Sequence, residues 1–144
     1  MTASRKLLCA VYATIALAAL IATWSQNPAY FHDPSVFSAL GTFLTDLKVN
    51  PASRSFSVDI LLFFLAASIL MVIEARKHNI KFVWAYIVGG AVIAISVAFP
   101  LFLIARELRL AKSDANVNLH WIDVVALAVI AVVIGALVVW IDAV

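Results

Sequence analysis

Residues 56–75 have the sequence FSVDILLFFLAASILMVIEA, in which the only charged side chains are Asp59 and Glu74, each close to an end. A helix needs roughly 20 apolar residues to span the hydrocarbon core of a bilayer, which is about 30 Å thick. Three further apolar runs occupy residues 7–24, 82–105 and 119–141. The sequence therefore predicts an all-α bundle of four transmembrane helices that forms a single integral membrane domain, residues 1–144.

The composition indicates the same class of protein. Of the 144 residues, 65% are hydrophobic and 12% are charged, and the mean hydropathy of +1.08 is far above that of a soluble domain. The net charge of +2 is small, and the Lys and Arg residues are too scattered to form a nucleic-acid site. Cys9 is the single cysteine, so no intrachain disulfide can form. We expect the lipid bilayer as a partner and no nucleic acid.

The first apolar run has two interpretations. Arg5 and Lys6 precede it, and Ala16-Leu17-Ala18, with small residues at its first and third positions, resembles the cleavage site of a signal peptide. The run continues to Trp24, however, whereas the apolar core of a signal peptide has only about 7 to 15 residues. We therefore expect an uncleaved first helix, with cleavage as the alternative.

The positive-inside rule does not decide the orientation of a four-span chain. If the N-terminus is cytoplasmic and every run crosses the membrane, five Lys and Arg residues lie on each side. The cytoplasmic set would be Arg5, Lys6, Arg76, Lys77 and Lys81, and the opposite set would be Lys48, Arg54, Arg106, Arg109 and Lys112. Because the first helix usually dominates, we expect a multi-pass protein of a bacterial inner membrane with a cytoplasmic N-terminus.

A short amphipathic helix is predicted between the first two runs, at residues 34–48. Asp33-Pro34 resembles an N-cap followed by proline at the first helical position. Apolar residues then recur at helical spacing, namely Val36, Phe37, Leu40, Phe43, Leu44 and Leu47. We expect this helix to lie in the membrane interface; a lid over the ends of the spans is the alternative.

Asp59 is the clearest candidate for a functional side chain. It lies about one turn inside the second run, where a carboxylate costs on the order of 2 kcal/mol or more unless it is paired, protonated or hydrated. An antiparallel third span would end on that side at Arg106, which predicts an Asp59–Arg106 ion pair, with proton handling or substrate binding as the alternative. Glu107, His120 and Asp123 lie on the same predicted side and complete a candidate charge cluster.

Glu74 belongs to a different end of the predicted bundle. It lies fifteen residues from Asp59, which corresponds to about 22 Å along a helix. The two carboxylates therefore mark opposite membrane faces and cannot act as one catalytic pair. We expect Glu74 to form a second charged cluster with Arg76, Lys77 and Lys81.

Other features predict a kink and argue against a metal. Pro100 removes a backbone hydrogen bond from the third run, so that a bend is expected near Ser96. His120 and Asp123 share a helix face, but a zinc site usually takes three or four ligands. Axial ligation of haem in a bundle would need a histidine at depth, and all three histidines lie in loops or at the ends of runs. We expect no metal and no cofactor.

Several motifs resemble those of a family of small bacterial membrane proteins known only as a domain of unknown function. The motifs are Asn50-Pro51, Ser53, Phe56, Asp59, Glu74-Ala75-Arg76, Trp84, Ser96, Phe99-Pro100-Leu101-Phe102-Leu103 and Arg106-Glu107. The resemblance covers about residues 7–110 and implies a compact three-helix membrane unit without an assigned activity. The fourth run, residues 119–141, departs from this pattern.

Three functional hypotheses are compatible with the sequence. No nucleophile arrangement or glycine-rich phosphate loop is visible, which favours a non-enzymatic accessory or assembly component with a membrane-protein partner or a second copy of itself. A small proton-coupled transporter is the second hypothesis, although the first run lacks the glutamate that compact four-helix multidrug exporters carry there. The third is a membrane-embedded enzyme that acts on an isoprenoid or other lipid, with Asp59 as the acid.

Overall fold

The computed structural model describes residues 2–30, 35–111 and 120–142, and within these ranges every regular element is helical. The elements are α1 (Ala3–Trp24), the 3-10 helix η1 (Asn27–Tyr30), α2 (Val36–Asp46), α3 (Pro51–His78), α4 (Val83–Val92), α5 (Ile95–Leu110) and α6 (Trp121–Asp142). In the described part of the chain, three segments are long and apolar enough to cross a membrane, and they contain α1, α3 and α6. The all-helical prediction is confirmed.

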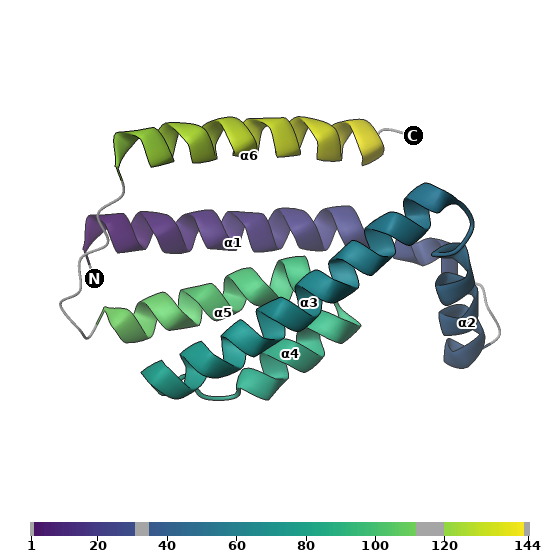
Figure 1. The fold of residues 1–144 in the computed structure, drawn as a ribbon, viewed down its shortest axis with the longest axis horizontal. Helices are drawn as coiled ribbons and strands as arrows, with labels where there is room; N and C mark the ends of the chain where they lie inside the picture. Colours follow the sequence, from purple (N-terminus) through teal and green to yellow (C-terminus); the bar gives the residue numbers. More distant parts are fainter. Residues whose placement is uncertain (1, 31–34, 112–119, 143–144) are drawn as a thin grey trace.

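The third apolar run is not a single spanning helix. α4 ends at Val92, the backbone is extended at Ala94 (φ −178°, ψ 141°), and α5 begins at Ile95. Figure 1 shows α4 and α5 side by side as an antiparallel hairpin. With 10 residues, α4 is about 15 Å long, which is half of the hydrocarbon thickness. The prediction of one continuous helix over residues 82–105 is therefore wrong.

The local sequence accounts for where the run breaks. Gly89 and Gly90 weaken the last turn of α4, because glycine costs about 1 kcal/mol in a helix relative to alanine. Pro100 has no N–H to donate to the Ser96 carbonyl, and it lies within α5 rather than at the break. The chain reversal thus falls before Ser96 and replaces the kink that was expected there.

Two contacts hold the tip of the hairpin. The indole N–H of Trp24, at the end of α1, donates to the Ile93 carbonyl over 3.3 Å. A Cβ atom at Gly90 would lie 3.0 Å from Phe64 Cε2 and 3.2 Å from Ile95 Cδ1, so glycine permits the close approach of α4 to α3 and α5. Small residues allow such helix contacts in lipid, where hydrophobicity cannot drive them.

The buried core lies where α3, α4 and α5 meet. Met71 and Phe102 have no exposed surface, and Ala75, Ile80 and Val83 pack around them. α1 packs along α5 on another side of the hairpin. The hairpin is consequently the central element of the fold, although α4 has only half the length needed to cross the hydrocarbon core.

α2 lies at the end of the bundle opposite the N-terminus, and Figure 1 shows it roughly perpendicular to α1. Its N-cap is Ser35, whose hydroxyl accepts the Ser38 N–H over 3.1 Å. The predicted helix over 34–48 is therefore present at Val36–Asp46, and the expected cap at Asp33-Pro34 lies outside the described residues. Phe37 is 88% exposed and no residue of α2 is buried, as expected for an interfacial helix.

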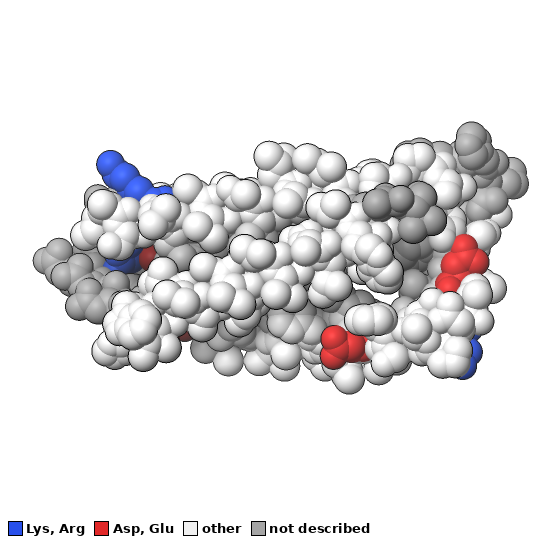
Figure 2. All heavy atoms as spheres, turned by 90° about the horizontal axis from the view of Figure 1, so that it is seen from above, with Lys and Arg blue, Asp and Glu red and all other residues white. Residues whose placement is uncertain are grey.

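The outer surface is predominantly apolar. The face drawn in Figure 2 is white over most of its length, with Lys and Arg atoms only toward its two ends. Every described side chain of α6 up to Ile141 is exposed, and this helix adds nothing to the buried core. Apolar surface of this extent implies contact with lipid.

A buried chain of charged residues joins three helices

Reversal of the chain at Ala94 brings three helix termini to one end of the bundle. α1 begins there, α3 ends there, and α5 returns to it from the tip of the hairpin (Figure 1). The residues that meet are Arg5 from α1, Glu74 and His78 from α3, and Arg106 and Glu107 from α5.

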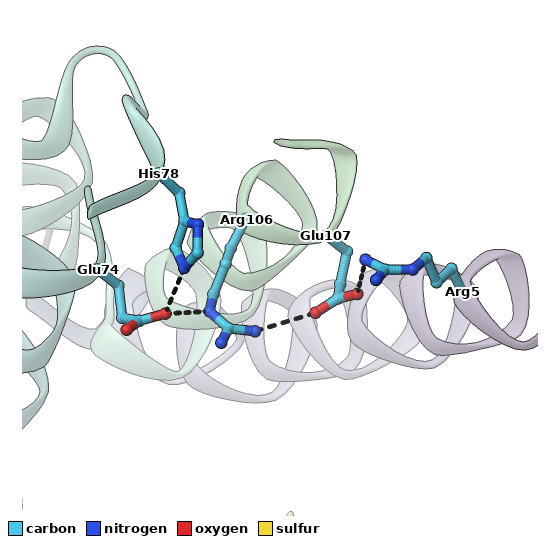
Figure 3. Close-up of polar contacts among 5 residues, drawn as sticks. All are labelled: Arg5, Glu74, His78, Arg106 and Glu107. Carbon is cyan, nitrogen blue, oxygen red and sulfur yellow. Dashed lines mark hydrogen bonds and ion pairs between the residues drawn. The ribbon is translucent and has the colours of Figure 1, made fainter. Parts of the chain in front are cut away.

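These five side chains form a continuous chain of ion pairs and hydrogen bonds (Figure 3). Arg5 Nη1 donates to Glu107 Oε2 over 3.1 Å, and Arg106 Nη1 donates to Glu107 Oε1 over 3.1 Å. The Nε of Arg106 donates to Glu74 Oε2. His78 Nε2 lies 3.4 Å from the same Glu74 oxygen, one helical turn along α3. Cationic or protonatable groups thus alternate with carboxylates.

The α1 end of this charged chain, Arg5 with Glu107, is withdrawn from solvent, whereas the Arg106 side chain is 30% exposed. Arg5 is 4% exposed and Glu107 is 2% exposed. The desolvation penalty for a buried ion is several kcal/mol, which only a well-placed counter-charge and further hydrogen bonds can offset. Both Glu107 oxygens accept from a guanidinium, which meets this requirement. The arrangement ties α1, α5 and α3 together.

The structure contradicts the predicted Asp59–Arg106 ion pair. Arg106 binds Glu74 and Glu107 instead, because α5 runs back toward the end of α3 and not toward its beginning. Asp59 is exposed near the opposite end of α3, and it forms no hydrogen bond or ion pair with any residue that the structure describes. The predicted cluster is therefore divided between two ends of the bundle.

The second predicted cluster also changes its membership. Glu74 pairs with Arg106 and His78, whereas Arg76, Lys77 and Lys81 have exposed side chains. Glu74 and those three cations lie at the same end of the fold, but the direct partners of Glu74 are Arg106 and His78.

His120 and Asp123 are explained by the start of α6. The Asp123 carboxylate accepts the backbone N–H of His120 over 3.1 Å, as a side chain in the first turn of a helix often does. Within residues 2–30, 35–111 and 120–142, no group of three or more His, Cys, Asp or Glu side chains is arranged to hold a metal ion. The pair is therefore a helix cap in this structure.

Sequence reasoning missed Arg5 and His78 as members of the charged chain. Arg5 precedes an apolar run, where a cation is expected for topological reasons alone. The sequence did contain one sign of an error in the predicted topology. That topology places equal numbers of Lys and Arg residues on the two sides of the membrane, whereas a correct topology normally gives an asymmetric count.

Comparison with known families gives one match. Residues 11–108 match the family described as Protein of unknown function DUF2834. The chain belongs to this family. The DUF2834 region contains the hairpin and four members of the charged chain, whereas Arg5 and α6 lie outside it. No curated protein and no solved structure matches the chain. The resemblance drawn from the sequence motifs is confirmed, and the family description carries no activity.

Proposed function

We propose that this DUF2834 protein is a non-enzymatic accessory or assembly component of a larger complex in a bacterial inner membrane. The observation that carries the proposal is the pairing within the charged chain. Glu74, Arg106 and Glu107 are all engaged with one another or with Arg5 and His78, so none of them is left to act on a substrate. Such a chain holds helices together, which is what a scaffold requires.

The proposed membrane arrangement follows from the hairpin. α1, α3 and α6 cross the bilayer, and α4 with α5 enters from one side and returns to it. Among the described residues, seven Lys and Arg then lie at the N-terminal end and two at the other. The first set is Arg5, Lys6, Arg76, Lys77, Lys81, Arg106 and Arg109, and the second is Lys48 and Arg54. The positive-inside rule now favours a cytoplasmic N-terminus.

α6 is the proposed attachment helix. It follows the DUF2834 region, it is exposed along its described length, and it contributes nothing to the core. A Cβ atom added at Gly135 would meet nothing within 4 Å, and Ala131 lies one turn away on the same face. This small-residue face suits close approach by a helix of another protein.

The surroundings of Asp59 favour the accessory role over transport or catalysis. Its carboxylate lies on the exposed surface of α3, flanked by the exposed apolar residues Val58 and Ile60. An ionised side chain in such surroundings is stabilised by a counter-charge, and a neighbouring protein can supply one. The charged chain, about 22 Å away along α3, cannot.

The test is purification of the tagged full-length protein from native membranes in mild detergent, followed by quantitative mass spectrometry. We expect one membrane protein at fixed stoichiometry, lost when Ala131→Leu and Gly135→Leu fill the small-residue face. The matched control is Val129→Leu with Val133→Leu on the opposite face of α6, which should retain the partner. Absence of a stoichiometric partner, or equal loss in both variants, would refute the role of α6.

A further inference from the structure

An apolar groove lies between α4 and α5 on the outer surface of the hairpin. Its floor includes Val97 and Ala98, which are buried, and its rim includes Gly89, Ile93 and Leu101. The volume is about 160 Å³, close to that of an apolar cavity of about 150 Å³ known to hold a benzene molecule. Such a groove can take part of a hydrocarbon chain.

The groove is shorter than one leaflet is thick. Its lining runs from Ala85 on α4 to Ile93, the residue that follows α4, over eight residues or about 12 Å. α4 begins and α5 ends at the end of the fold that carries the charged chain. In the membrane arrangement proposed above, the groove therefore lies in the leaflet at that end, and Lys81 precedes Ala85 by four residues.

Three exposed cations lie at the same end of the fold as the start of α4. Arg76 and Lys77 are in the last turn of α3, and Lys81 lies in the turn that leads into α4. None of the three takes part in the charged chain, whose carboxylates are already paired with Arg5 and Arg106. Their positive charge is thus available to an anionic group at the membrane surface.

We propose that the α4–α5 hairpin is a binding site for one anionic phospholipid, whose phosphate headgroup contacts Arg76, Lys77 and Lys81 and whose acyl chain occupies the groove beside Gly89. The inference uses the insertion of the hairpin into one leaflet and does not depend on the accessory role or on a protein partner.

The experiment uses the full-length protein in nanodiscs of equimolar phosphatidylglycerol and phosphatidylcholine, released for native mass spectrometry. We expect retained phosphatidylglycerol to exceed retained phosphatidylcholine by at least about fivefold at low salt, because each Lys or Arg near the surface favours anionic lipid. High salt should reduce this ratio, since the headgroup contact is screened.

Two pairs of variants test the headgroup contact and the acyl-chain contact separately. Neutralising Arg76, Lys77 and Lys81 to Gln should bring the lipid ratio close to one, whereas Lys48→Gln with Arg54→Gln, at the other end, should leave it unchanged. Gly89→Leu should lower the number of retained lipids, because Gly89 lines the groove and a Cβ atom there meets nothing within 4 Å. Gly41→Leu on α2 is the matched control, because a Cβ atom there also meets nothing within 4 Å.

The proposal is overturned by an equimolar lipid ratio in the unmodified protein, or by the same change in both charge variants. It is also overturned if Gly89→Leu retains as much lipid as Gly41→Leu. The salt comparison on the unmodified protein tests headgroup selectivity even where a variant fails to fold.

Discussion

Arg5 and Glu107 are 102 residues apart in the chain and form a buried ion pair of 3.1 Å between Nη1 and Oε2. Their contact requires that α5 end where α1 begins. It therefore records the reversal of the chain at Ala94. The ion pair is a structural consequence of the hairpin and also one of the interactions that hold it.

Glu107→Gln should destabilise the protein strongly. The substitution removes the Glu107 carboxylate from the guanidinium of Arg5, which is 4% exposed, and breaking a buried ion pair costs about 3–5 kcal/mol. Thermal unfolding in detergent measures the effect as a lower Tm. The double variant Arg5→Met with Glu107→Leu should recover most of the loss, because an apolar pair removes both charges.

Lys6→Gln is the control for this series, since Lys6 is adjacent to Arg5 and exposed. A surface substitution of this kind is expected to change stability by no more than about 0.5 kcal/mol. If the Glu107→Gln protein has the same Tm as the Lys6→Gln protein, the buried pair is energetically unimportant.

Gly89 and Gly90 should respond differently to the same substitution. At Gly90 a Cβ atom would lie 3.0 Å from the ring of Phe64 and 3.2 Å from Ile95, so Gly90→Ala forces these side chains to shift. Such overpacking typically costs about 1–3 kcal/mol. Gly89→Ala meets nothing within 4 Å and should be neutral or slightly stabilising, because alanine is the better helix former. Equal melting temperatures for the two variants would rule out the close packing of α4 described above.

The turn between α3 and α4 contains two residues in the left-handed region, Asn79 at φ 52° and Phe82 at φ 61°. Asparagine tolerates this conformation, whereas a bulky residue loses about 1–2 kcal/mol in it. Phe82 is 79% exposed, so little packing is lost when it is replaced. Phe82→Gly should therefore raise the Tm and Phe82→Val should lower it; the reverse order would contradict the turn geometry.

The elements defined by length and hydropathy were predictable from the sequence. The runs at 7–24, 56–75 and 119–141 fall within or close to α1, α3 and α6, and the amphipathic spacing after Ser35 predicted α2. These predictions succeed because apolar length and helical periodicity are local properties of the chain.

The hairpin was not predictable in the same way, because the reversal at Ile93 and Ala94 contains no polar residue. Hydropathy indicates that a segment prefers an apolar phase, and it does not report the direction in which the chain runs. The carbonyl of Ile93 is satisfied by Trp24, a donor 69 residues away. Because the direction of α5 was misassigned, Arg106 and Glu107 were placed at the wrong end of the bundle. For the same reason, Arg106 was not recognised as a partner of Glu74.

The most direct test of the hairpin is the sidedness of single cysteines in sealed membranes, in a Cys9→Ala background. Lys81→Cys precedes α4, Ala111→Cys follows α5, and Lys48→Cys precedes α3. With a membrane-impermeant maleimide, we expect Lys81→Cys and Ala111→Cys to react from the same side and Lys48→Cys from the opposite side. Labelling of Lys81→Cys and Ala111→Cys from opposite sides would show that residues 82–105 cross the membrane and would contradict the fold described here.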